Sequence, residues 1–167
     1  PMGFREAVIG GRAVGVPGTL RLLERMHGDH GKLAWGDLLQ PALDLARRGF
    51  AVSPRLHQSL VVSAETLADD PVAASYFLDD TGRPWPIGHR LQNSDYAALL
   101  ETLMAEGVDA FYTGPIADDL EDKVQGHGTN PGLLSSDDLS RYQAIRRAPV
   151  CVPYQQFRVC GMGPPSS

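Results

Sequence analysis

The chain has 167 residues, of which 43% are hydrophobic and 21% are charged. These proportions are ordinary for a single globular domain, and they exclude a disordered or a fibrous protein. Its 15 basic and 20 acidic residues give a formal net charge of -5, and no segment concentrates lysine or arginine. Because a nucleic-acid backbone requires such a basic surface, we expect no nucleic-acid partner.

The two ends of the chain indicate a longer protein. The first residues, PMGFREAVIGG, lack the basic start and apolar centre of a signal peptide. No apolar run is long enough to cross a bilayer, so we expect no membrane span in this segment. The chain begins at Pro1 and stops at Ser167, soon after a strand-like run, and we therefore expect both ends to be internal.

Two amphipathic helices are predicted in the first third of the chain. Pro17 can open a helix at its first turn, and its apolar residues recur at helical spacing until Gly28 and Gly31 end it. The next helix covers residues 35–48 and stops at Gly49, with two arginines in its last turn. Pro41 lies in this helix, and we expect it early enough to be tolerated.

Helical signals continue through the middle of the chain. Ser53 is a good N-cap for a helix that begins with proline and runs to about residue 68. Proline and glycine interrupt the stretch that follows, in which only a short helix over 72–77 is expected. Asn93 or Ser94 then caps a helix that Gly107 ends.

The last quarter of the chain changes from helical to strand spacing. The stretch 114–128 repeats the helical pattern, and the serines and aspartates of 133–142 predict a capped single turn. The β-branched and aromatic runs over 144–152 and 155–162, separated by Pro153 and Tyr154, then predict a terminal β-hairpin.

The histidine pair His27 and His30 and the cysteine pair Cys151 and Cys160 each have a functional and a structural interpretation. His27 and His30 have the spacing of metal ligands, but no second cluster supplies further ligands, so we interpret them as a solvated helix end. Cys151 and Cys160 face each other if the hairpin turn is centred near residues 155 and 156, which permits a disulfide. We favour the alternative that they are two free, partly buried thiols.

Three blocks of sequence together resemble the large subunit of the gamma-glutamyltranspeptidase family. They are A-x-G-V-P-G at 13–18, W-x-D-L-L-Q-P-A-L-x-L-A-R-x-G-F at 35–50 and F-Y-x-G-x-I-A at 111–117. The resemblance spans nearly the whole chain. It implies an α+β fold class, in which residues 1–143 are helical and residues 144–167 form a hairpin in the central sheet of an αββα N-terminal nucleophile hydrolase.

The resemblance also implies a chemistry. Family members cleave themselves, and the freed threonine takes a gamma-glutamyl group from glutathione, with its own amine as base. Water, an amino acid or a peptide then accepts the group, and no metal or organic cofactor is implied. The nucleophile is the first residue of a small subunit, so this subunit is an expected partner and this chain alone is expected to be inactive.

No catalytic residue is therefore expected in this chain. Its six threonines all lack the Thr-Thr-His context of the family's cleavage point. Arg5 lacks the proline of the family's carboxylate-binding arginine motif, and we interpret it as a loop or strand-end residue. The terminal P-P-S-S run resembles a family stretch that approaches the active site, so Ser166 and Ser167 are the candidate substrate-binding residues.

Two other functions remain open at this point. A beta-lactam (cephalosporin) acylase-like enzyme of the same architecture would share these helices and differ in a substrate pocket that this chain largely omits. A non-catalytic helical interaction module is the second alternative, since the chain has amphipathic helices and lacks a nucleophile. The periplasm or the cell exterior is the expected location, by resemblance alone.

Overall fold

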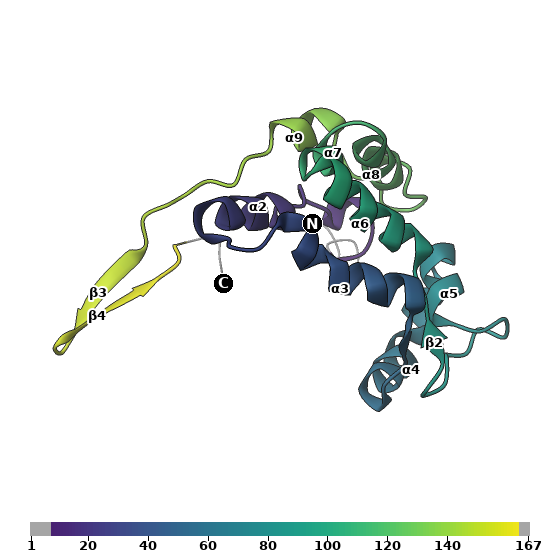
Figure 1. The fold of residues 1–167 in the computed structure, drawn as a ribbon. Coiled ribbons are helices and arrows are strands. Elements are labelled where there is room, and N and C mark those ends of the chain that lie inside the picture. The colour runs from purple at the N-terminus through teal and green to yellow at the C-terminus, as the bar shows by residue number, and fades with distance from the viewer. Residues whose placement is uncertain (1–7, 164–167) are drawn as a thin grey trace.

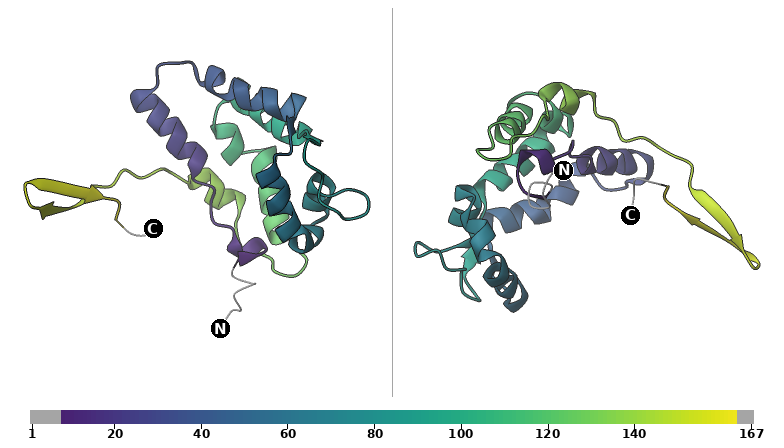
Figure 2. Two further views of the ribbon diagram at one scale, coloured as in Figure 1. Left: turned by 90° about the horizontal axis from the view of Figure 1, so that it is seen from below. Right: turned by 180° about the vertical axis from the view of Figure 1, so that it is seen from behind.

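A computed structural model describes residues 8–163 of the chain, and most of it is helical (Figure 1). In chain order, its elements are η1 (Gly11–Ala13), α2 (Thr19–His30), α3 (Trp35–Arg48), β1 (Phe50–Ala51), α4 (Pro54–Ala68), α5 (Pro71–Phe77), β2 (Arg90–Leu91), α6 (Ser94–Glu106), α7 (Asp109–Tyr112), α8 (Pro115–Gln125), α9 (Ser136–Arg141), β3 (Val150–Tyr154) and β4 (Phe157–Gly161). The helices form one body, and the β3–β4 hairpin projects away from it in both views of Figure 2.

The helix ends lie close to where the capping residues predict them. The Ser53 side chain accepts a hydrogen bond from the backbone of α4, and Asn93 does the same for α6. Ser135 and Asp138 form a reciprocal capping box that starts α9. Helix α2 begins at Thr19 and not at Pro17, which lies in the irregular segment before the helix.

Helix α3 has the predicted bounds, but one expectation about it is wrong. Gly49 follows its last residue with a φ of 75°, which glycine adopts without strain. Pro41 lies inside the helix, beyond the first turn in which a proline costs nothing. The helix continues past Pro41, whose side chain is exposed to solvent.

Two short features were not predicted. β1 and β2 are antiparallel strands of two residues each, which pair Phe50 with Leu91. Such strands are too short to show an alternating pattern, so only the fold brings them together. The four-residue helix α7 is similarly too short to show helical periodicity.

The core consists of two clusters. The first joins α7, α8 and α9 around Tyr112, Ala117 and Leu139, each of which has no exposed surface. The second lies between α3 and α6, where Leu43 and Ala46 meet Ala97 and Leu100. The helical body therefore has its own apolar interior.

The predicted terminal hairpin is confirmed, with two corrections. Its turn is at Gln155 and Gln156, so Pro153 and Tyr154 belong to β3 and do not separate the strands. Cys151 and Cys160 are direct register partners and form a disulfide, so the favoured expectation of free thiols is wrong. The two residues are adjacent across the strand pair because the turn lies at residues 155 and 156, which is the condition under which the sequence permits a disulfide.

One face of the hairpin is apolar except for the hydroxyl of Tyr154. Side chains of register partners lie on the same face of a strand pair. Val152 pairs with Val159 and Tyr154 pairs with Phe157, with Val150 beside them. These five side chains are between 53% and 62% exposed. The hairpin thus presents an apolar face that the described part of the chain leaves largely uncovered.

Candidate functional site

The predicted substrate-binding residues, Ser166 and Ser167, lie outside the described residues. Strand β4 ends at Gly161, shortly before them in the chain. The assignment of these two serines therefore stays a prediction, as does the interpretation of Arg5, which also lies outside the described residues.

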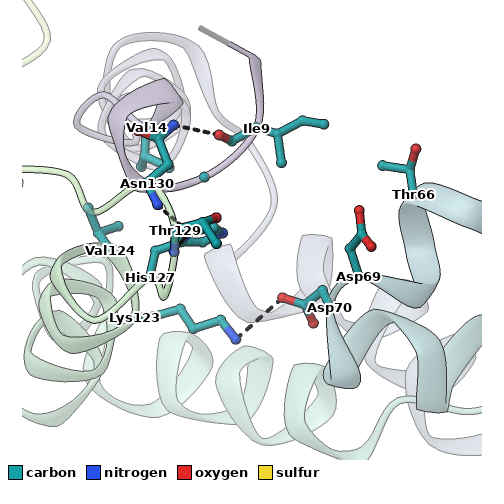
Figure 3. A pocket seen from close by; sticks show the side chains of 12 residues that line it. Ile9, Val14, Thr66, Asp69, Asp70, Lys123, Val124, His127, Thr129 and Asn130 are labelled. Atoms are coloured by element: carbon teal, nitrogen blue, oxygen red, sulfur yellow. Dashed lines mark hydrogen bonds and ion pairs between the residues drawn. The ribbon is translucent and has the colours of Figure 1, made fainter. Parts of the chain in front are cut away.

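A cleft of about 740 Å³ in the helical body is lined by several charged and polar side chains (Figure 3). Three parts of the chain meet there: the turn that contains η1, the junction of α4 and α5, and the end of α8 with its following loop. Its lining residues are Ile9, Gly10, Gly11, Val14, Thr66, Asp69, Asp70, Lys123, Val124, His127, Thr129 and Asn130.

The carboxylate of Asp70 serves as a helix cap in this cleft. It accepts backbone hydrogen bonds from Val72 and Ala73, at 2.8 and 3.0 Å, at the start of α5. Its second oxygen lies 3.5 Å from the ammonium of Lys123. The hydrogen bond from Ala73 is the largest cause that lowers the pKa of Asp70. A carboxylate held in its charged form this way is a weak general base.

His127 is also engaged with the backbone. Its Nδ1 lies 3.1 Å from the backbone nitrogen of Asn130 and 3.4 Å from that of Thr129. Since both backbone groups are donors, Nδ1 accepts and carries no proton. Asn130 is buried, and its Nδ2 donates to the carbonyl of Ile9 at 2.7 Å. His127 and Asn130 therefore hold the N-terminal turn against α8.

The polar side chains of this cleft have structural roles. Activation of a hydroxyl nucleophile requires a base within hydrogen-bond distance. Thr66 and Thr129 line the cleft, and its Asp70 and His127 already bind backbone N–H groups. The hydrogen bonds and the ion pair of Asp70, His127 and Asn130 therefore connect three segments of the chain at this cleft.

Other threonine hydroxyls bind nearby groups of their own segments. Thr102 Oγ1 donates to the carbonyl of Ala98 and Thr113 Oγ1 donates to that of Asp109. Thr81 Oγ1 donates to Asp79 at 2.6 Å in the turn after α5. These are local bonds of helices and turns. The prediction that no threonine of this chain is catalytic remains a prediction.

The histidine pair at the end of α2 has a structural explanation. The Nε2 atom of His27 lies 2.8 Å from the carbonyl oxygen of Leu33, and its ring meets Trp35 edge-on. His27 thus fixes the turn between α2 and α3. Within residues 8–163, no three His, Cys, Asp or Glu side chains are grouped in a way that could hold a metal ion.

The sequence interpretation missed a network around Arg21. Its guanidinium lies 2.6 Å from Asp109 and 3.1 Å from Glu24, and it stacks over the ring of Tyr112. Tyr112 in turn donates to the carbonyl of Pro17 at 2.5 Å. Burial opposes the charge of Arg21, but the hydrogen bonds to Asp109 and Glu24 outweigh it and raise the pKa of Arg21. The network anchors α2 to α7.

Comparison with known proteins places these features in a family. The family model for gamma-glutamyltranspeptidase matches residues 2–167. The chain belongs to this family. In a crystal structure of gamma-glutamyltranspeptidase from Helicobacter pylori, 46% of the chain superposes on 99% of this one, with a TM-score of 0.89 and 28% identity. The predicted fold class, a helical segment with a hairpin from an N-terminal nucleophile hydrolase, is confirmed.

Curated relatives are much longer than this chain. The chain is 40% identical, over 163 residues, to the acylase ACY 1 proenzyme of Pseudomonas sp. (strain V22) and 34% identical, over 164 residues, to the glutathione hydrolase proenzyme of Bacillus subtilis (strain 168). Each match covers 98% of this chain, but only 28% and 27% of the respective relative. The chain thus spans little more than a quarter of the relatives' length.

The described part of the chain contains no helix that is both long and apolar enough to span a membrane. The names of both relatives contain the word proenzyme, which fits a family whose members are processed from a precursor.

Proposed function

We propose that this chain is part of the large subunit of an enzyme that transfers or hydrolyses the gamma-glutamyl group of glutathione and related amides. The match of the family model over residues 2–167 is the observation that carries this proposal. The nucleophile is the N-terminal threonine of a small subunit that follows Ser167 in the precursor. Its hydroxyl attacks the amide carbon, its own amine accepts the proton, and the acyl group passes to water, an amino acid or a peptide.

The role of this chain in that enzyme is to support the site. Residues 1–143 form the helical part, and residues 144–167 form a hairpin of the central sheet. The apolar face of the hairpin supports this assignment, because five exposed apolar side chains on one face need a covering layer. No metal or organic cofactor takes part in the proposed mechanism.

The proposed substrate contacts are the hydroxyls of Ser166 and Ser167. They follow β4 in the chain and match the family's P-P-S-S stretch. In the longer protein, Ser166→Ala and Ser167→Ala are expected to raise KM, since hydroxyl donors to an amide substrate would be lost. An unchanged KM in the double variant would remove both serines from the proposed site.

The proposed location of the enzyme is the periplasm or the cell exterior. The Cys151–Cys160 disulfide supports it, because disulfides persist in oxidising compartments. The proposed partners are the small subunit, glutathione and an amino-acid or peptide acceptor.

One experiment tests the enzyme proposal directly. The gene beyond the codon for Ser167 is expected to encode Thr-Thr-His at the start of the small subunit. The processed two-subunit protein is expected to release the amine from a gamma-glutamyl anilide, and the same protein with that threonine changed to alanine is the control. Residues 1–167 alone are expected to release none. The absence of a Thr-Thr-His sequence downstream would refute the proposal.

A second candidate activity is that of a beta-lactam (cephalosporin) acylase. The identity of 40% to an acylase proenzyme, above the 34% to the glutathione hydrolase of Bacillus subtilis, favours it. Both activities require the same nucleophile, so the substrate decides between them. A kcat/KM for an acyl cephalosporin well above that for the gamma-glutamyl anilide would favour the acylase.

A further inference from the structure

The disulfide joins two residues that lie directly opposite each other in the hairpin. Cys151 and Cys160 are separated by 9 positions in the sequence and form the second register pair of β3 and β4, counted from the end opposite the turn. In β4 every residue is exposed, and in β3 only Cys151 is half-buried. The described part of the chain therefore contributes little burial that would stabilise the strand pair.

The local sequence of the hairpin is a weak determinant of its register. A two-stranded hairpin alone is marginally stable in water. Gln155, at the turn, has a φ of 53°, which is unfavourable for a residue other than glycine, asparagine or aspartate. Pro153, in β3, has no N–H to donate to the strand pair. Both features leave the register poorly defined without a further constraint.

The disulfide lies on the face opposite the apolar one. Successive residues of a strand point to opposite faces, so Cys151 and Cys160 point away from the side on which Val152 and Val159 lie. A register shift by one residue would move residues of one strand to the other face. The disulfide thus prevents a shift that would disrupt the apolar face, and it does so without occupying that face.

We propose that the Cys151–Cys160 bond is a redox-dependent staple that fixes the register of the hairpin before its apolar face is covered. Formation removes two protons and two electrons from the thiols, and a disulfide donor accepts them and becomes two thiols. A dithiol reverses the step and becomes a cyclic disulfide. Closure of so short a loop favours the paired hairpin by a factor on the order of 100. The proposal concerns this chain alone and does not depend on the proposed enzyme activity.

Alkylation and hydrogen exchange test the staple in the 167-residue chain. Purified without reductant, the chain is expected to take up no alkylating label, and after dithiothreitol it is expected to take up two. Reduction is expected to lower amide protection over residues 150–161 by up to about 100-fold, while α3 and α6 keep theirs. Labelling without reductant, or equal hairpin protection in both states, would overturn the proposal.

A rescue variant separates register fixation from other effects of the sulfur atoms. Cys151→Ser with Cys160→Ser is expected to match the reduced chain. Addition of Gln155→Asn and Gln156→Gly supplies a type I′ turn, which favours the same two-strand pairing, and is expected to restore most of the protection. The matched control carries the turn substitutions with both cysteines kept, and is expected to resemble the unchanged chain. Hairpin protection that stays low in the rescue variant would contradict a role in register.

Discussion

At the scale of single residues, close backbone contacts and caps position the segments around the cleft. Gly11 is buried where η1 meets the loop after α8. A Cβ atom on it would lie 2.1 Å from the carbonyl oxygen of Val124 and 2.4 Å from the backbone nitrogen of Gly132. Because these are backbone atoms, the contact can be relieved only if the segments move apart.

Gly11→Ala is therefore expected to lower the free energy of unfolding by about 2 kcal/mol or more, as other overpacked sites do. Gly28, in α2, is the control, because a Cβ there meets no atom within 4 Å. Gly28→Ala is expected to stabilise the chain by up to about 1 kcal/mol. Denaturant unfolding of both variants measures the contrast, and equal effects would show that the contact of Gly11 is not tight.

Asp70 combines a helix cap with an ion pair, and the cap is expected to contribute more. Asp70→Ala is expected to cost about 1 kcal/mol at pH 7 through the loss of the cap. Lys123→Ala is expected to cost less than about 0.5 kcal/mol, because the pair is exposed to solvent. If Asp70→Ala and Lys123→Ala lowered the free energy of unfolding in urea equally, the contribution of Asp70 would come from the ion pair and not from the cap.

The effect of Asp70 should also depend on pH. Its folded-state pKa is lowered, so its stabilising contribution is complete above the ordinary value of about 4 and is lost as the pH falls through the lower folded value. The difference in stability between Asp70→Ala and the unchanged chain is expected to shrink below about pH 4. A difference that stays constant down to pH 2 would contradict this cause.

At the scale of elements, the packing of α3 on α6 forms one of the two core clusters. Leu43 and Ala46 of α3 are buried and meet Leu100 of α6, which is 3% exposed. The amphipathic patterns indicate that each helix has an apolar face. They do not identify the partner helix, which depends on the path of the chain between them.

Leu100→Ala is expected to lower the free energy of unfolding by about 3 kcal/mol, because it leaves a cavity between α3 and α6. Leu45→Ala is the matched control from the same helix pair, since Leu45 is 55% exposed. The control is expected to cost less than about 1 kcal/mol. Thermal or urea unfolding followed by circular dichroism gives both values, and similar losses would place Leu100 outside a packed core.

At the scale of the whole molecule, the hairpin has an apolar face that the described part of the chain leaves largely exposed. In residues 1–167 alone, this face is expected to bind a hydrophobic dye and to promote self-association. Val152→Thr with Val159→Thr is expected to reduce both effects without a change in the unfolding of the helical body. Val62→Thr on α4, which removes a 77% exposed side chain, is the control and is expected to change neither. Light scattering that responds equally to both substitutions would contradict a specific role of the hairpin face.

Helix positions and caps were predictable from the sequence because their determinants are local. The interactions of Ser53, Asn93 and Ser135 reach only the next turn of the chain, so each cap can be recognised from its neighbours. Family membership was likewise predictable from three local blocks of residues. For the candidate site, the sequence predicted that this chain lacks the nucleophile. It also proposed Ser166 and Ser167 as substrate-binding residues, and these lie outside the described residues.

What the tertiary structure alone decided are contacts between residues distant in the sequence. Arg21 reaches Asp109, Asn130 reaches Ile9, and β1 pairs with β2, and no local pattern marks any of these partners. The disulfide lies between the two cases: the sequence allowed Cys151 and Cys160 to meet, but only the strand register decided that they do. A shift of one residue would separate them, and local strand propensity does not specify the register.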